Sequence, residues 1–340
     1  MIVRSLVAAA LALAAVPAAS APACGCGAMI PSDPNLRAEG QRVDEWSIVR
    51  FDGAREDITM RLESSAAFSR AALIMPLPAE ATFALGHDAV FDDMAERTKP
   101  RVVKKTRHVL FGGDDDDEAG GGDEGTRAAG AGAVEVVSAQ DLGPLRVVTL
   151  RGDDADVVAT WLSDHGFEAP EGLVPIAQAY LDREWLLAAI RLRAEGGEPL
   201  QRLQPLIMSF DTDRVVYPLR MSQLASAPTE ARVDVVAPSP LAVRSWPARD
   251  LEKPTTTGSG RLYGGPMPNG RYLTSYRFAM SPNRPPFDDP EFVPAARKDF
   301  RQEIVEYEEV DVTGRVLGIA GGVIVVLAAA AVFVVRRRRA

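Results

Sequence analysis

The chain is poor in the residues from which most catalytic and metal sites are built. Its 340 residues include only two cysteines and three histidines. Two cysteines form no disulfide framework, and the histidines do not have the H-E-x-x-H spacing of zinc peptidases. The G-x-S-x-G and S-x-x-K motifs of serine hydrolases are also absent. The sequence therefore predicts no catalytic residue, no cofactor-binding residue and no metal ligand.

The two cysteines, Cys24 and Cys26, stand close together in Cys24-Gly25-Cys26. A disulfide between them would close a small, strained ring. Lipid attachment at Cys24 is a second interpretation, although Ala21-Pro22-Ala23 lacks the aliphatic residue that lipoprotein signals carry. A metal site would need further ligands, because two thiolates do not complete a tetrahedron. Free, disulfide-bonded and lipidated cysteines all remain open.

The two ends of the chain predict its location. Residues 1–23 combine an early cation, a short apolar run and a small-residue cleavage site, which is typical of a secretory signal peptide. Val316 to Val335 is uncharged and long enough for a transmembrane helix, and four arginines follow it. By the positive-inside rule, residues 336–340 form a cytoplasmic tail. We expect a single-pass cell-membrane protein that faces outward, with oligomeric state undetermined.

The excess of acidic residues argues against nucleic acid as a partner. The chain carries 47 acidic and 38 basic residues, and Arg336 to Arg339 lie outside the predicted outer region. Nucleic acid is thus not an expected ligand. An acidic, glycine-rich stretch, Asp114 to Gly125, predicts a solvated, disordered loop over about residues 112–132. Calcium binding is the alternative for this loop, although its spacing is not that of an EF-hand.

The pattern of apolar and turn residues over 24–245 predicts an extracytoplasmic α+β domain, in which helices pack on a mixed sheet. Asp44 to Arg61 reads as a hairpin around Asp52-Gly53, and Ala71 to Met75 as a buried strand. Asp88 is expected to cap a helix that ends before Pro100. Two more helices are predicted, one after Asp153 or Asp154 that ends at Gly166 and one after Pro170. Further strands are expected at 145–150, 185–192, 206–210, 215–219 and 233–236.

Residues 246–315 differ in composition. Prolines recur from Pro247 to Pro294, and glycines cluster at 258–265. The sequence predicts an extended stalk or loosely packed loops, with one strand at Tyr272 to Met280. Lys298 to Asp311 is expected to be a helical segment next to the membrane.

Several short motifs resemble one bacterial family. They are Ile74-Met75-Pro76-Leu77-Pro78, Arg97-Thr98-Lys99-Pro100, Trp161-Leu162 followed by His165-Gly166-Phe167, and Leu203 to Leu219. Together they resemble domain-of-unknown-function family 2330 over about residues 24–227. The resemblance implies membrane-anchored envelope proteins and no particular activity, so it assigns no catalytic residue.

The sequence thus favours a binding or structural module at the cell envelope, with an envelope protein as its expected partner. The alternative is an extracytoplasmic, hydrolase-like enzyme whose site is assembled from residues distant in sequence. A pocket lined by buried carboxylates with shifted pKa values would favour that enzyme.

Overall fold

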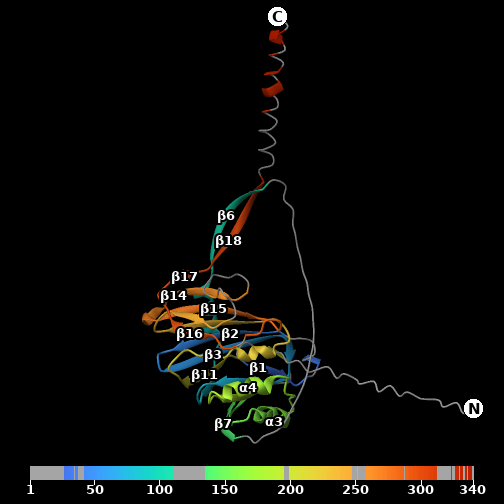
Figure 1. The fold of residues 1–340 in the computed structure, drawn as a ribbon, viewed down its shortest axis with the longest axis vertical. Helices are drawn as coiled ribbons and strands as arrows, with labels where there is room; N and C mark the ends of the chain where they lie inside the picture. The colour runs from blue at the N-terminus through green and yellow to red at the C-terminus, as the bar shows by residue number, and fades with distance from the viewer. Residues whose placement is uncertain are drawn as a thin grey trace, which may run out of the picture. The chain divides into compact units, whose positions relative to one another are not determined.

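The computed structural model describes residues 27–33, 35–36, 42–109, 135–194, 199–246, 251, 258–286 and 288–311, and isolated residues between 323 and 338. The chain divides into two compact units (Figure 1). Unit 1 comprises Met1–Lys99 and Asp123–Arg301, and unit 2 comprises Pro100–Gly122 and Gln302–Ala340. The predicted signal peptide, Cys24, Cys26 and the acidic loop lie outside the described residues.

Unit 1 contains two large sheets. The five-stranded sheet has the order β1 (Ala28–Pro31), β4 (Arg70–Leu77), β9 (Leu186–Arg193), β8 (Leu145–Arg151), β7 (Glu135–Leu142). The nine-stranded sheet has the order β17 (Phe300–Arg301), β14 (Gly260–Pro266), β15 (Tyr272–Met280), β12 (Thr229–Ala237), β2 (Val43–Phe51), β3 (Arg55–Phe68), β11 (Leu206–Asp211), β5 (Thr82–Leu85), and β10 (Leu200–Arg202) also pairs with β3. A separate pair joins β13 (Leu241–Arg244) to β16 (Glu291–Pro294).

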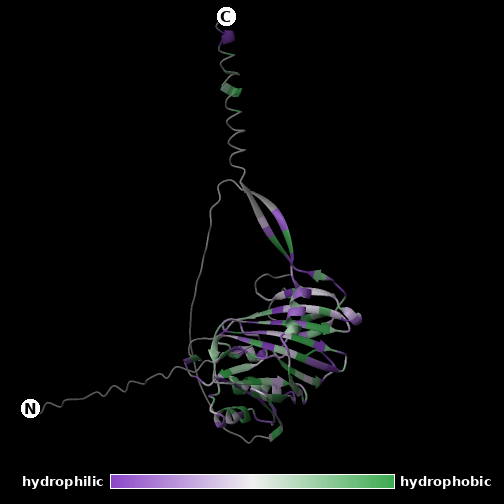
Figure 2. Ribbon diagram, turned by 180° about the vertical axis from the view of Figure 1, so that it is seen from behind, coloured by the Kyte–Doolittle hydropathy of each residue, from purple (hydrophilic) through white to green (hydrophobic). Residues whose placement is uncertain are grey.

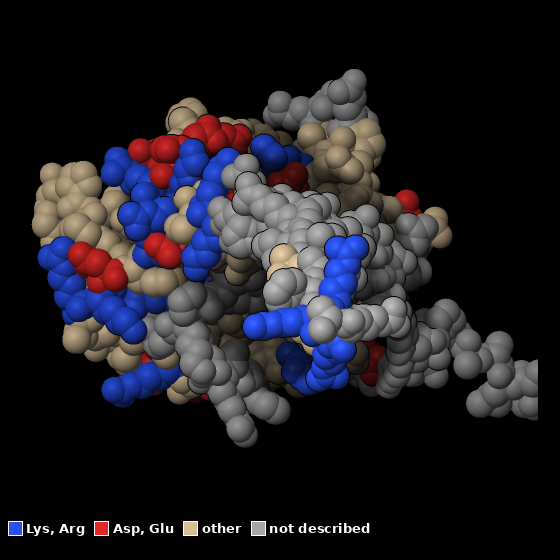
Figure 3. Space-filling model, turned by 90° about the horizontal axis from the view of Figure 1, so that it is seen from above, with Lys and Arg blue, Asp and Glu red and all other residues tan. Residues whose placement is uncertain are grey.

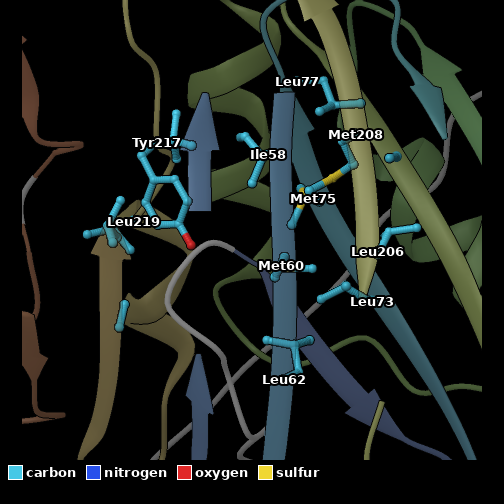
Figure 4. Packing of buried hydrophobic residues seen from close by; sticks show 14 of the residues in the cluster. Ile58, Met60, Leu62, Leu73, Met75, Leu77, Leu206, Met208, Tyr217 and Leu219 are labelled. Atoms are coloured by element: carbon cyan, nitrogen blue, oxygen red, sulfur yellow. The ribbon is translucent and has the colours of Figure 1, made fainter. Parts of the chain in front are cut away.

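The main hydrophobic core lies between the two sheets. Figure 4 shows Ile58, Met60 and Leu62 of β3 with side chains from β4 and β11 around them. These positions alternate along each strand, as expected for sheets with one face turned to the core. The α+β fold class is therefore confirmed, with strands making up most of the structure.

Helices cover the outer faces of both sheets. Helices α3 (Asp156–Asp164) and α4 (Leu173–Leu181) and the short 3₁₀ helix η2 (Arg220–Leu224) pack on the five-stranded sheet, and their buried residues share one cluster with Ala72, Ile74 and Leu187. Helix α2 (Ala89–Thr98) packs on the nine-stranded sheet through Phe91 and Met94. Unit 1 is therefore layered as helix, sheet, sheet, helix.

The predicted hairpin is confirmed. Strands β2 and β3 pair in antiparallel register, and the Asp52 carboxylate accepts hydrogen bonds from the backbone N–H groups of Ala54 and Arg55 at 2.9 and 2.8 Å. Gly53 has a φ of 114°, which favours glycine at this turn. The strand predicted at Ala71 is also confirmed, but it continues through Pro76. Proline is tolerated there because β1 begins at Ala28, opposite Ile74, so no residue of β1 lies opposite Pro76 to accept an N–H.

The helix predicted after Asp88 forms, but the expected cap does not. Asp88 makes no capping hydrogen bond, and its carboxylate instead accepts one from Arg61 at 3.1 Å. The helices predicted around Trp161 and after Pro170 are confirmed as α3 and α4, and Gly166 follows α3 with a φ of 78°. Neither Asp153 nor Asp154 is the N-cap of α3, which is Ala155.

The strand predicted at 215–219 is wrong. These residues are buried but form no strand. The N–H of Val216 donates instead to the buried Glu56 carboxylate at 2.9 Å, so a side chain replaces a neighbouring strand as the acceptor.

The stalk predicted for residues 246–315 is also largely wrong. Strand β15 is confirmed, and it pairs along its whole length with β12 while β14 pairs with its other edge. Most of the described prolines of this region lie in the connections around these strands, so a prediction from composition alone was misled. Lys298 to Asp311 contains strands β17 and β18 (Glu303–Asp311) rather than a helix.

Unit 2 contains a two-stranded parallel ribbon of β18 and β6 (Arg101–Val109). The predicted span begins with residues 316–322, which lie outside the described part of the chain, and only isolated helical residues of it are described. Among the described residues, none of the helices has both the length and the apolar character needed to cross a bilayer.

Candidate functional site

Four arginines gather on one face of the five-stranded sheet. Strand register sets Arg193 of β9 directly opposite Arg70 of β4, and Arg191 of β9 directly opposite Arg146 of β8. Paired residues on neighbouring strands project from the same face, and so do residues two positions apart on one strand. All four guanidinium groups are therefore neighbours. Like charges directly opposite each other destabilise a sheet, so folding alone does not favour this arrangement.

The arginines occupy the part of this face that the helices leave open. Closer to the centre of the sheet, Ala189 and Leu187 of β9 are buried in the same cluster as α3 and α4. Arg191 is half-buried and Arg193 is exposed. They line a cavity of about 190 Å³ with Arg70, Arg146, Asp141 and residues of the surrounding turns and strands, namely Gly143, Pro144, Leu145, Phe167 and Leu192. We call this cavity the arginine pocket.

The turn after α3 positions Arg70. The Arg70 guanidinium donates a hydrogen bond to the carbonyl oxygen of His165 at 3.1 Å and lies 5.5 Å from the centre of the Phe167 ring. The His165 ring stacks on Trp161 with centroids 4.4 Å apart, and its Nδ1 is 2.7 Å from the Trp161 carbonyl oxygen. His165 is thus held against the end of α3. The contacts fix the carbonyl oxygen that accepts from Arg70.

The pocket has an excess of positive charge. Arg146 pairs with Asp141 at 3.2 Å, and Asp141 is the single acid among the lining residues. In the described part of the chain, the side chains of Arg191 and Arg193 make no hydrogen bond or ion pair. Burial, followed by the charges of Arg146 and Arg193, lowers the pKa of Arg191. It remains charged near neutral pH, since an arginine pKa lies far above that range. The pocket is thus suited to an anion.

Arginine pairs of this kind bind oxyanions. A guanidinium offers parallel N–H donors that match the two oxygens of a carboxylate or phosphate. In contrast, cations and anions are interspersed on the face of the molecule drawn in Figure 3. Outside the arginine pocket, Arg55 lies 3.0 Å from Asp211, and Arg202 lies 3.2 Å from Glu63. The arginine pocket differs because its guanidiniums outnumber its acids.

Two buried carboxylates have raised pKa values, but neither lines the arginine pocket. Burial raises the pKa of Glu56 well above its usual value, and it also raises the pKa of Asp289. Asp289 accepts hydrogen bonds from the Tyr180 hydroxyl at 2.7 Å and the Arg220 backbone N–H at 2.9 Å. It therefore ties the segment before β16 to α4 and η2, which is a structural role.

The described residues contain no group of three or more histidine, cysteine or acidic side chains arranged to hold a metal ion. His87 lines a second, open hollow with Asp88, Arg202 and Gln204, none of which lines the arginine pocket. The metal and calcium interpretations of Cys24, Cys26 and the acidic loop concern residues outside the described set.

A family model described as "Uncharacterized protein conserved in bacteria (DUF2330)" matches residues 20–263. The chain belongs to the DUF2330 family. A search of curated proteins gives no match. Among solved structures, the crystal structure of baculovirus P35 is similar with a TM-score of 0.32 and 10% identity, covering 76% of this chain and 98% of that one. A likeness this low carries no argument about fold or function.

The DUF2330 match includes all four arginines. One of the motifs that carry the resemblance, His165-Gly166-Phe167, forms the turn that holds Arg70. The pocket was not predicted from the sequence. The available signal was the alternation Arg191-Leu192-Arg193 in a predicted strand, but the register that brings Arg70 and Arg146 beside it could not be read from the sequence.

Proposed function

We propose that this DUF2330 protein is a binding module that holds an anionic group of its ligand in the arginine pocket. The proposal rests on two pairs of directly opposed arginines, Arg70 with Arg193 and Arg146 with Arg191. A bound anion would attract all four guanidinium groups and so offset their mutual repulsion. Anion binding therefore explains an arrangement that folding alone does not favour. The ligand class is a small oxyanion, a carboxylate or a phosphate.

The size and walls of the pocket support a small anionic group. About 190 Å³ suffices for one or two oxyanion groups but not for a whole drug-sized ligand, since such ligands occupy several hundred Å³. The ring of Phe167 adds apolar surface beside Arg70. We therefore expect the pocket to hold the charged end of a larger molecule or a free small anion.

We further propose that the domain is displayed at the outer side of the cell membrane. This rests on the sequence of the ends: the signal-like residues 1–23, the uncharged stretch 316–335 and the four arginines after it. In this arrangement unit 1 faces the envelope, and the ligand is an anionic component of that compartment or of a partner protein. Protease protection of an epitope tag at the C-terminus in intact cells tests the orientation. Digestion of that tag from outside would refute it.

Thermal unfolding of the full-length protein in detergent tests the anion site. Pyrophosphate and citrate are the probes, since they separate a preference for phosphate from one for carboxylate. We expect at least one of them to raise the Tm at low ionic strength, and Arg191→Gln/Arg193→Gln to abolish the rise.

The matched control is Arg55→Gln, which removes an exposed arginine that pairs with Asp211 outside the pocket. This variant should respond to the anions as the wild type does. An absent response in wild type, or an equal response in the pocket variant, would refute the proposal.

The enzyme alternative remains a prediction that no observation favours. The carboxylates with raised pKa values, Glu56 and Asp289, are engaged by backbone and tyrosine donors and do not line the arginine pocket.

A further inference from the structure

The ribbon of β6 and β18 is unusual as a parallel pair of strands. Parallel strands occur almost only in sheets whose two faces are covered, and an isolated two-stranded sheet is marginally stable in water. On this ribbon, however, Val102 is 50% exposed and Ile304, directly opposite it, is 41% exposed. Figure 2 shows hydrophobic and hydrophilic segments along both strands. The ribbon thus has apolar surface that an additional partner could cover.

The two faces of the ribbon differ. One face carries Val102 and Lys104 of β6 beside Ile304 and Glu306 of β18, in direct register. In the described part of the chain, Lys104 and Glu306 form no ion pair or hydrogen bond. On the other face, Arg101 and Glu303 pair at 3.3 Å, and the exposed apolar surface comes from the ring of Tyr307, which is 58% exposed, rather than from a facing aliphatic pair. The Val102–Ile304 face therefore combines uncovered aliphatic side chains with charges that have no partner among the described residues.

The charges are divided between the strands. Strand β6 contains basic residues and no acidic ones, whereas β18 contains acidic residues and no basic ones. Two copies related by a twofold axis along the strands would face each other with β6 of one copy over β18 of the other. A twofold axis across the strands would instead set β6 on β6 and β18 on β18, with like charges together. Charge complementarity thus selects the first arrangement.

We propose that the Val102–Ile304 face of the ribbon packs on the same face of a second copy of this chain. In this dimer, Ile304 lies against Val102 of the second copy, and Lys104 faces Glu306 of the second copy. Both ribbons run in one direction, so both chain ends can enter the same membrane, as the proposed anchor requires. Confinement to one membrane would raise the effective concentration and compensate for a small interface.

Site-directed cross-linking of the full-length protein in its native membrane tests the dimer. Two differently tagged copies are coexpressed in a Cys24→Ser/Cys26→Ser background, one with Val102→Cys and the other with Ile304→Cys. Mild oxidation is expected to link the two tags by a disulfide. The matched control pair, Lys105→Cys and Tyr307→Cys, lies on the opposite face and should give several-fold less product. Equal yields from both pairs would overturn the proposal, and so would no product from the first pair.

A charge exchange provides a second readout that does not depend on cysteines. Lys104→Glu should reduce dimer recovery by a chemical cross-linker several-fold, because it sets two acids against each other. Lys104→Glu/Glu306→Lys should restore it, since the exchange recreates complementarity between copies. Failure of the double variant to recover, while Lys104→Glu alone is impaired, would contradict the facing arrangement. Neither assay depends on anion binding, so the dimer and the proposed anion site can fail independently.

Discussion

Replacing Arg191 by glutamine is expected to stabilise the ligand-free protein while removing its response to anions. Arg191 lies directly opposite Arg146 and two positions from Arg193 on the same strand face. Its side chain makes no hydrogen bond or ion pair within the described residues, so the substitution removes repulsion without removing a partner. A like-charged pair directly across two strands costs roughly 0.2–1 kcal/mol.

In a domain of this size, 1 kcal/mol corresponds to a Tm change of about 2–4 °C, so Arg191→Gln should raise the Tm by roughly 0.4–4 °C. The gain should shrink in high salt, because mobile ions screen the partly exposed charges. Pyrophosphate at tenfold its Kd should stabilise the wild type by about 1.4 kcal/mol and the variant by much less.

Differential scanning calorimetry of the full-length protein, with and without pyrophosphate and at two salt concentrations, measures both effects. Arg55→Gln is the control: it loses an exposed ion pair, so its Tm should stay the same or fall slightly. An Arg191→Gln protein that is less stable than wild type without anion would show that Arg191 supports the fold. Repulsion among the pocket arginines would then not be what limits the stability of the ligand-free protein.

Three further substitutions test the electrostatics of unit 1. Asp141→Asn removes the acid that pairs with Arg146, so calorimetric titration should show tighter pyrophosphate binding; weaker binding would show that Asp141 orients Arg146 for the ligand. Burial raises the pKa of Glu56, so the stability associated with its protonated form is present below the unfolded-state pKa and is lost as pH rises through the folded-state pKa. Glu56→Gln should therefore flatten that decline in urea unfolding across a pH series, and an unchanged pH profile would contradict this. Tyr180→Phe leaves the buried Asp289 without one donor and should lower the free energy of unfolding by about 1–3 kcal/mol, whereas no change in urea midpoint would mean that other donors suffice.

Local signals in the sequence predicted many of the elements. The Asp52-Gly53 turn and the apolar spacing around Trp161 predicted a hairpin and a helix that the structure contains. Composition was less reliable: prolines and glycines after residue 246 indicated a stalk, but β14 and β15 are paired strands of the larger sheet. Pairing partners decide such segments, and they lie far away in the chain, as with β15 and β12.

The arginine pocket shows the same limit at the level of a site. Arg70, Arg146 and Arg191 come from three strands, and only strand order and register bring them together. The family resemblance, by contrast, could be predicted from short motifs and is confirmed by the match over residues 20–263. One of these motifs contains Phe167, which lines the pocket, but nothing local in the motif indicates which arginine it contacts.

The most direct test of the anion site is to locate a bound oxyanion. Crystals of the full-length protein soaked in sodium tungstate, a heavy analogue of phosphate, would show its position by anomalous scattering. We expect tungstate in the arginine pocket, within hydrogen-bonding distance of the guanidinium groups of Arg191 and Arg193. Tungstate bound elsewhere, with this pocket empty, would refute the proposed anion site.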